Sequence, residues 1–166
     1  MLILDATAGP RGIWLNKEYE NAIYMDVDLR DYNYYSKHPQ IRADSKYLPF
    51  RAGIFDLIIF DPPHRSFSKK CNLGKEYGSF SLEDIKLLIK FGSAEFFRTL
   101  KEDGFLIFKW NTVDIDIEGI LKLMSFWFDP LFGHSIIKRS GKTTTFWVCM
   151  VKTKISKITQ KPILLA

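Results

Sequence analysis

The residues with the clearest potential for chemistry follow a hydrophobic run near the middle of the chain. The run at residues 55–60 leads directly into Asp61-Pro62-Pro63-His64. Two consecutive prolines end a strand, because proline cannot donate a hydrogen bond to the sheet, and they fix the backbone after Asp61. A carboxylate, the Pro62 carbonyl and the flat ring of His64 are thereby presented to one small volume. Two acceptors of this kind can bind both hydrogens of an exocyclic amine while the ring stacks on the attached base.

A loop of small residues follows the first apolar run of the chain. Residues 5–12 read Asp5-Ala6-Thr7-Ala8-Gly9-Pro10-Arg11-Gly12. Small residues and glycines let a backbone turn tightly and approach a ligand closely. The spacing is not the G-x-G-x-x-G of dinucleotide-binding loops, and alone the loop is equally typical of an ordinary turn between a strand and a helix.

Carboxylates also end the second and third apolar runs, at Asp26 and Asp44. Asp26 lies 21 residues after Asp5 and 14 residues after Gly12. In nucleotide-binding α/β folds an acid about 20 residues beyond the glycine loop holds ribose hydroxyls. Asp44 alone is as typical of a solvated turn. Because ligands bind at the carboxyl ends of parallel strands, we expect Asp5, Asp26, Asp44 and Asp61 to face one site.

The elements that must position these residues alternate between short apolar strands and helices. A Ser81-x-x-Asp84 capping pattern predicts a helix that runs up to Leu100, and an Asp103-Gly104 turn leads from it into the fifth strand. A shorter helix is expected at 116–124. Strands are expected at residues 2–4, 22–25, 41–44, 55–60, 105–108 and 144–152. Continuous apolar strands that alternate with helices predict one α/β domain with a mostly parallel sheet, helices on both faces and an antiparallel strand near the C-terminus.

Asp61-Pro62-Pro63-His64 resembles the [Asp/Asn/Ser]-Pro-Pro-[aromatic] motif of class I S-adenosylmethionine-dependent amino-methyltransferases. These enzymes methylate the amino group of adenine or cytosine, and related ones modify RNA or a protein glutamine. Residues 5–14, 55–64, 106–111 and 130–134 also look like the corresponding segments of small methyltransferase-like proteins of phages and prophages. The resemblance runs from Leu4 to about Lys152 and implies a Rossmann-like methyltransferase fold.

Carried over residue by residue, the resemblance implies a role for each motif. The loop with Asp5, Ala6, Thr7 and Gly9 would surround the methionine part of S-adenosylmethionine. Asp26 would hold the ribose hydroxyls, and Asp44 the adenine amino group. The implied acceptor site consists of Asp61 and the Pro62 carbonyl, which orient the target nitrogen, Pro63, which fixes the backbone, and His64, which stacks on the base. No metal is required.

The expected substrate is a nucleobase amine in DNA or RNA, with adenine N6 favoured. Arg65, Lys69 and Lys70 follow the motif in a basic segment that suits a phosphate backbone, and a solvated lid is the equal alternative. The residues expected to line the substrate site from the end of the fifth strand are Lys109, Trp110 and Asn111. The alternatives are methylation of a protein side-chain amide or a small molecule, and a nucleic-acid-binding module without catalysis.

Composition and charge are compatible with these expectations. The 166 residues are 46% hydrophobic with a formal net charge of +5. Residues 1–129 hold 17 Lys/Arg and all 19 Asp/Glu, whereas residues 130–166 hold the other 7 Lys/Arg. We expect a methyltransferase domain at 1–153, a basic tail at 154–166, and target recognition supplied by a partner subunit or a homodimer. No segment is apolar enough to span a membrane. Cys71 and Cys149 lie far apart in the sequence and outside any metal-binding spacing, so we expect free thiols and a reducing cytoplasm.

Overall fold

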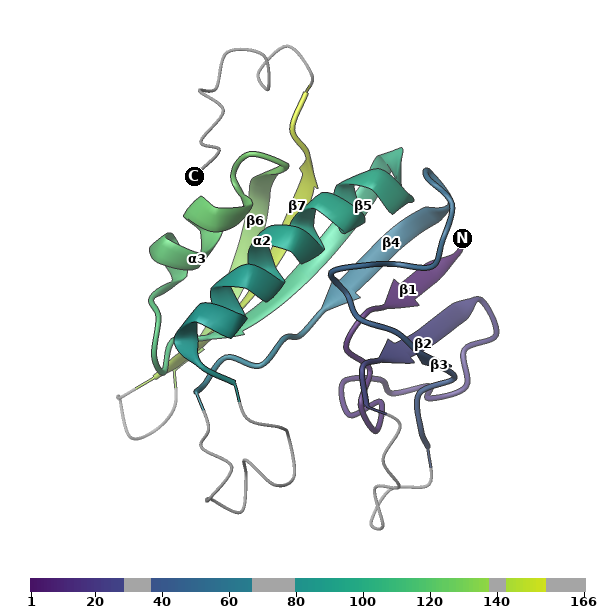
Figure 1. Cartoon of the computed structure of the whole chain (residues 1–166), viewed down its shortest axis with the longest axis horizontal. Coiled ribbons are helices and arrows are strands. Elements are labelled where there is room, and N and C mark those ends of the chain that lie inside the picture. Colours follow the sequence, from purple (N-terminus) through teal and green to yellow (C-terminus); the bar gives the residue numbers. More distant parts are fainter. Residues whose placement is uncertain (29–36, 67–79, 138–142, 155–166) are drawn as a thin grey trace.

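A seven-stranded sheet forms the centre of the protein in the computed structural model, which describes residues 1–28, 37–66, 80–137 and 143–154 (Figure 1). The strand order is β3-β2-β1-β4-β5-β7-β6. The elements in chain order are β1 (Ile3–Asp5), β2 (Ala22–Asp26), β3 (Ile41–Arg42), β4 (Phe55–Phe60), α2 (Leu82–Thr99), β5 (Leu100–Asn111), α3 (Ile117–Met124), β6 (Phe128–Ile137) and β7 (Thr144–Lys152). The first five strands pair in parallel, and β7 is antiparallel to both β5 and β6. The predicted parallel sheet with an antiparallel C-terminal strand is confirmed.

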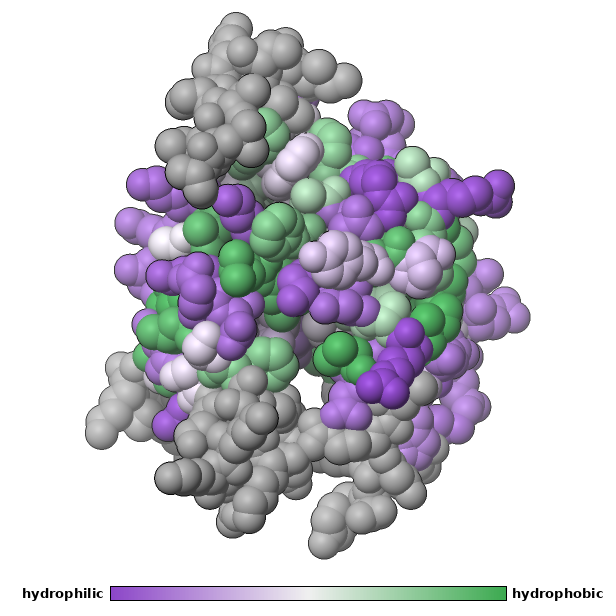
Figure 2. All heavy atoms as spheres, viewed as in Figure 1, coloured by the Kyte–Doolittle hydropathy of each residue, from purple (hydrophilic) through white to green (hydrophobic). Residues whose placement is uncertain are grey.

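Both helices of the described residues, α2 and α3, lie over the same face of the sheet (Figure 1). Phe96 of α2 packs edge-on against Phe60 of β4, with ring centroids 4.7 Å apart. On this face the core continues through buried side chains of β5 and β7, among them Phe108 and Val148. Hydrophilic and hydrophobic residues are interspersed on the outer surface of this side of the molecule (Figure 2). The helices expected on the opposite face are not among the described residues.

The opposite face of β1, β2 and β4 is covered by the loop that follows β1. A small second core there contains Ile3, Ala22 and Tyr24, with Trp14 and Tyr19 packed against it. The Trp14 ring meets the Tyr24 ring edge-on at 5.0 Å between centroids. The loop after β1 is therefore fixed by its aromatic side chains as well as by its backbone.

The two helices begin as their sequences predict. Ser81 caps α2 in a capping box, because its side chain accepts from the Asp84 amide while the Asp84 carboxylate accepts from the Ser81 amide. Asp116 caps α3 by accepting from the Gly119 amide at 2.6 Å. Each cap satisfies amide groups that have no partner inside the helix.

Two strands differ from the prediction. The sequence predicts an Asp103-Gly104 turn before the fifth strand, but these residues lie inside β5, which begins at Leu100. The pairing of β4 with β5 shifts in register between Phe55 and Leu57 of β4. β6 was not predicted, because Pro130 and Gly133 are atypical of a strand interior. Gly133 is required there, since a β-carbon at this position would lie 2.8 Å from the Trp147 carbonyl oxygen of the neighbouring β7.

Cys149 is a buried free thiol, as predicted, and its burial raises the pKa of the thiol. Cys71 lies outside the described residues, as do residues 155–166 of the expected tail. Among the described helices none is both long and apolar enough to cross a membrane.

Candidate functional site

Three of the predicted carboxylates stand at the carboxyl ends of adjacent parallel strands. Asp5 is the last residue of β1, Asp26 is the last residue of β2, and Asp61 follows β4 directly. β1 lies between β2 and β4 in the sheet. Burial is the main cause that raises the pKa of the Asp5 carboxyl group, and the nearby Asp61 and Asp26 add to the rise electrostatically. The sheet therefore brings these three carboxyl groups to one edge, where α/β folds bind ligands.

Asp5 is completely buried at the centre of this group. Its Oδ2 accepts a hydrogen bond from the Trp14 indole at 2.7 Å, and its Oδ1 accepts from the Thr7 amide at 3.2 Å. Burial raises the pKa of Asp5 to about 7, and the two hydrogen bonds oppose that rise only in part. Asp5 is therefore a carboxyl group that changes its protonation state near neutral pH.

The loop after Asp5 is bonded on one side to β4 and to the residue that follows it. The Ala6 amide donates to the Ile59 carbonyl at 2.9 Å. The Thr7 hydroxyl accepts from the Asp61 amide at 2.8 Å. The loop and the start of the Asp-Pro-Pro motif are thus held at a fixed separation.

Gly9 connects the same loop to β2. Its amide donates to Asp26 Oδ2 at 2.9 Å, and its φ of 46° lies in the left-handed region that glycine adopts without strain. Asp26 Oδ1 accepts from the Asp28 amide at 3.1 Å. Burial raises the pKa of Asp26. The Asp26 carboxylate therefore orders the loop in addition to any contact with a ligand.

Asp44 lies in the turn that follows β3. Its Oδ1 accepts from the Lys46 amide at 2.9 Å, and its Oδ2 lies 3.5 Å from Lys46 Nζ. The adjacent Ser45 is buried, and its hydroxyl donates to the Ala6 carbonyl at 2.8 Å. Ser45 thus attaches the Asp44 turn to the loop after β1. The sequence interpretation missed Ser45, although its place directly after a strand-end carboxylate was a usable signal.

Asp61 forms an ion pair with Lys109 of β5. Lys109 Nζ lies 2.5 Å from Asp61 Oδ2, and the two side chains are 26% and 20% exposed. The ammonium group also stands 5.5 Å from the centre of the Trp147 ring of β7. Lys109 is therefore held between a carboxylate and an aromatic face, which is a favourable position for a cation. Trp147 was not predicted, because its position depends on the antiparallel pairing of β7 with β5.

Trp110 differs in orientation from the residues on either side of it. Successive side chains of a strand point to opposite faces, so Trp110 points away from Lys109 and Asn111. It is fully buried, and its indole donates to the Ile115 carbonyl at 3.0 Å. The His64 ring meets the Trp110 ring edge-on, with centroids 6.2 Å apart. Trp110 thus supports His64 from the core side, whereas the sequence interpretation placed it in the lining of the site.

Asn111 is a buried polar side chain at the end of β5. Its amide nitrogen donates to the Thr145 hydroxyl at 2.8 Å, while its Oδ1 has no hydrogen-bond partner in the structure. Such an unsatisfied acceptor is costly to bury. Asn111 therefore retains an unused hydrogen-bonding atom near Lys109, on the same side of the strand.

The segment after the Asp-Pro-Pro motif is fixed where it begins. Pro62 is buried, Pro63 is half-buried, and Arg65 is exposed. Both the amide and the hydroxyl of Ser66 bond to Asp114 Oδ2, at 2.7 and 2.8 Å. These bonds lower the pKa of Asp114. Lys69 and Lys70, predicted to contact substrate, lie outside the described residues.

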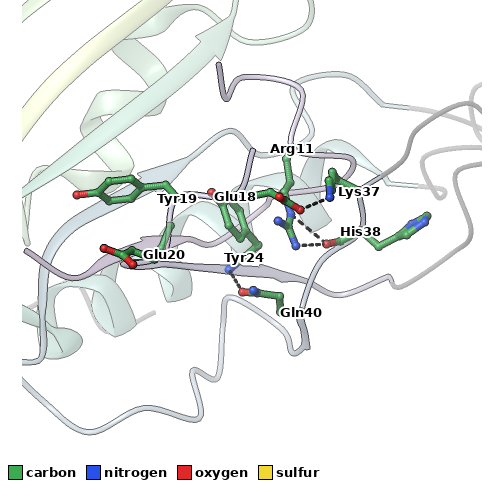
Figure 3. A pocket seen from close by; sticks show the side chains of 9 residues that line it. Arg11, Glu18, Tyr19, Glu20, Tyr24, Lys37, His38 and Gln40 are labelled. Carbon is green, nitrogen blue, oxygen red and sulfur yellow. Dashed lines mark hydrogen bonds and ion pairs between the residues drawn. The ribbon is translucent and has the colours of Figure 1, made fainter. Parts of the chain in front are cut away.

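A cavity of about 290 Å³ lies beside β2, apart from these residues (Figure 3). Arg11 is buried there with a φ of 56°, and its guanidinium carbon stands 3.9 Å from the centre of the Tyr24 ring. Its nitrogens donate to the backbone carbonyls of Lys17 at 2.6 Å and His38 at 2.7 Å. The lining residues are Arg11, Glu18, Tyr19, Glu20, Ala22, Tyr24, Lys37, His38 and Gln40. None of them is a predicted site residue, and Arg11 acts there as a tie between three backbone segments.

Comparison with known proteins identifies the fold. No protein-family model and no curated protein sequence matches the chain. Among solved structures, the PH0226 protein of Pyrococcus horikoshii OT3 is 14% identical with a TM-score of 0.60, over 91% of this chain and 81% of that one. A TehB-like SAM-dependent methyltransferase of Corynebacterium glutamicum is 18% identical with a TM-score of 0.55, over 91% and 79% of the two chains.

A third solved structure contains bound ligands. It is the 1,6-didemethyltoxoflavin-N1-methyltransferase of Burkholderia thailandensis, with 1,6-didemethyltoxoflavin and S-adenosylhomocysteine bound. It is 12% identical with a TM-score of 0.59, over 92% of this chain and 71% of that one. The chain therefore has the Rossmann-like methyltransferase fold that the sequence predicted.

Proposed function

We propose that this protein is an S-adenosylmethionine-dependent methyltransferase that acts on an exocyclic amino group of a nucleobase in DNA or RNA, with adenine N6 the favoured target. One observation carries the proposal. Asp61 and the rigid prolines after it stand at the carboxyl end of β4, and the Asp61 amide is bonded to Thr7 of the loop after β1. The acceptor motif and the expected cofactor loop are thus joined directly. The fold, shared with known methyltransferases, supports the methyltransferase part of the proposal.

The residues at this edge of the sheet fit the cofactor in chemical type. S-adenosylmethionine carries a positively charged sulfur, an ammonium group, ribose hydroxyls and an adenine amino group, all of which favour carboxylate or carbonyl partners. Asp5, Asp26 and Asp44 are carboxyl groups on or beside the loop anchored by Gly9 and Ser45. We assign Asp26 to the ribose hydroxyls and Asp44 to the adenine amino group, and the loop with Asp5, Ala6 and Gly9 to the methionine part.

The cofactor supplies a methyl group that its positively charged sulfur has already activated. The protein's own residues must then hold the acceptor nitrogen in line with that methyl group and exclude water. Lys109 occupies Asp61 Oδ2, so Oδ1 and the Pro62 carbonyl are the two acceptors offered to the hydrogens of an amine. The ammonium group of Lys109 also fixes the orientation of the Asp61 carboxylate. His64, supported by Trp110, provides the ring that stacks on the attached base.

The substrate class rests on the chemistry of this acceptor. Two hydrogen-bond acceptors and a flat ring fit a planar, neutral amine better than a flexible alkylammonium ion. A nucleobase amine also accounts for the basic residues that follow the motif, of which Arg65 is exposed. A target in duplex DNA must be rotated out of the base stack before its amino group can reach Asp61.

A methyl-transfer assay with matched variants tests this proposal. Tritiated S-adenosylmethionine is incubated with the protein and with separate pools of DNA, RNA, cellular protein and small molecules. We expect label in a nucleic-acid pool, and we expect Asp61→Ala, which removes the acceptor oxygens, to abolish it while cofactor binding persists. Asp56→Ala is the control, because Asp56 pairs with Lys101 as Asp61 pairs with Lys109, but at the other end of the same strand.

The outcomes separate the possible functions. Label only in protein or in small molecules would refute a nucleobase substrate while leaving a methyltransferase. Transfer that survives Asp61→Ala undiminished would refute the role of the Asp-Pro-Pro motif. Binding of nucleic acid with no transfer to any pool would favour a binding module that retains the fold.

A further inference from the structure

The two edges of the sheet are protected very differently. At one edge β3 has only two residues, and the Arg42 side chain bonds to the Val27 carbonyl at 3.2 Å. At the other edge β6 has ten residues, and within the part of the chain that the structure describes it pairs only with β7. An edge strand presents unpaired amide and carbonyl groups, and proteins ordinarily keep such strands short, charged or interrupted. β6 has a proline and an irregular register at its start, and after them it continues without interruption.

The part of β6 after Pro130, residues 131–137, is uncharged and apolar at the surface. Leu131 lies at the register shift, and regular pairing with β7 begins at Phe132. This segment reads Leu131-Phe132-Gly133-His134-Ser135-Ile136-Ile137, without Lys, Arg, Asp or Glu. Four of its side chains are large, apolar and exposed: Leu131 55%, Phe132 70%, Ile136 53% and Ile137 69%. We refer to these four side chains as the β6 strip. A surface strip of this kind is unusual in a chain of which 26% of the residues are charged.

The order of residues in the strip is symmetric about His134. If a second copy of β6 pairs antiparallel to the first around a two-fold axis at His134, Phe132 stands opposite Ile136 of the other copy. Gly133 then stands opposite Ser135, and Leu131, which lies at the register shift, comes next to Ile137. Residues directly opposite in an antiparallel pair lie on the same face, so Phe132 and Ile136 of each copy meet an apolar partner. This self-complementarity follows from the sequence of β6 and its position in the sheet.

We propose that the protein forms a homodimer in which the β6 strands of two copies pair antiparallel around His134 and join the two sheets. We choose a second copy as the partner because this part of β6 complements itself, and a two-fold interface requires such a surface. The strip is neutral, so two copies of a chain with a net charge of +5 meet there without placing like charges in contact.

The area of the strip agrees with such an interface. Its four side chains expose on the order of 400 Å² of apolar surface, and a standard interface buries about 800 Å² per partner, of which somewhat more than half is apolar. The backbone of β6 and the polar side chains of His134 and Ser135 supply the remainder. The inference is independent of the proposed catalytic activity.

Sedimentation velocity of the full chain tests the dimer at protein concentrations from about 1 to about 200 µM, which covers the micromolar dissociation constants of the weaker interfaces of this size. We expect a dimer that dissociates on dilution. Phe132→Glu and Ile136→Lys each place a charge against an apolar partner twice, because of the two-fold axis, and each should raise the dissociation constant at least about tenfold. The double variant Phe132→Glu/Ile136→Lys puts opposite charges across each pair, so it should dimerise more tightly than either single variant, and less so in high salt.

Phe91→Glu is the matched control. Phe91 is 46% exposed on α2, away from β6, so its replacement should leave the dissociation constant unchanged. Circular dichroism confirms that each variant is folded. A wild-type protein that is monomeric at the highest concentration would overturn the proposal. Single variants that dimerise like the wild type, or a double variant no tighter than the single ones, would overturn the register around His134.

Discussion

The buried carboxyl group of Asp5 makes the stability of this protein depend on pH in a direction opposite to that of most acidic residues. Asp5 has no exposed surface, and its pKa is raised to about 7 in the folded protein, mainly because burial disfavours the charged form. In the unfolded chain its pKa returns to the ordinary value of about 3.9. The folded state therefore binds a proton that the unfolded state has lost between about pH 4 and pH 7.

The sign and the size of the effect follow from this difference. Below about pH 4 Asp5 is neutral in both states, and its titration costs no stability. As the pH rises to about 7, the unfolded chain ionises first and folding becomes less favourable by up to about 1.4 kcal/mol per pH unit. Above pH 7 the full cost remains, with an upper bound of about 4 kcal/mol.

Urea unfolding at a series of pH values measures this cost, with Asp5→Asn as the comparison. The variant cannot ionise, although its amide gives up the bond from either Trp14 or Thr7 and so lowers stability by a constant amount. We expect the wild type to lose unfolding free energy relative to Asp5→Asn as the pH rises from 5 to about 7. Two curves that stay parallel over that range would refute the raised pKa and the buried state of Asp5.

Three further predictions concern packing, an ion pair and the acceptor site. Gly104→Ala should lower the unfolding free energy by about 1–3 kcal/mol, because the added methyl group would lie 2.7 Å from a leucine side chain; Gly12→Ala, with open space around it, should have little effect in the same urea titration. Glu95→Gln should cost about 1–2 kcal/mol at pH 7, since Glu95 bonds to Arg98 at 2.7 Å. Because this pairing lowers the pKa of Glu95, the stability it gives is lost as the pH falls through that lowered pKa, so the Glu95→Gln difference should shrink in acid. Lys109→Met should reduce the methyl-transfer rate, measured at saturating cofactor, about tenfold or more. The dissociation constant of the cofactor, measured by titration, should change little.

The sequence predicted the elements whose signals are local. The strand before Asp61 is a continuous apolar run ended by two prolines, and the helix after Ser81 begins with a capping box, so both follow from a few neighbouring residues. The strand-end acids Asp5, Asp26 and Asp61 were identified for the same reason. The parallel pairing of their strands is sufficient to place these three residues at one edge of the sheet.

The remaining features depend on contacts between distant segments. β6 is an edge strand whose side chains are exposed on both faces, so it lacks the alternation of apolar and polar residues that identifies a half-buried strand. The contact of Lys109 with Trp147 requires β7 to lie antiparallel beside β5. The inward orientation of Trp110, by contrast, follows from the alternation of side chains along a strand, because three consecutive strand residues cannot all face one site.

Calorimetric titration of the protein with S-adenosylmethionine tests the central claim most directly, namely that the edge formed by Asp5, Asp26 and Asp61 is a cofactor site. We predict one binding site per chain with a dissociation constant on the order of 1–100 µM, weakened at least about tenfold by Asp26→Asn. Asp56→Asn, at the opposite end of the sheet, should bind like the wild type. Absence of binding at about 1 mM cofactor, or equal binding by the wild type and Asp26→Asn, would contradict the claim.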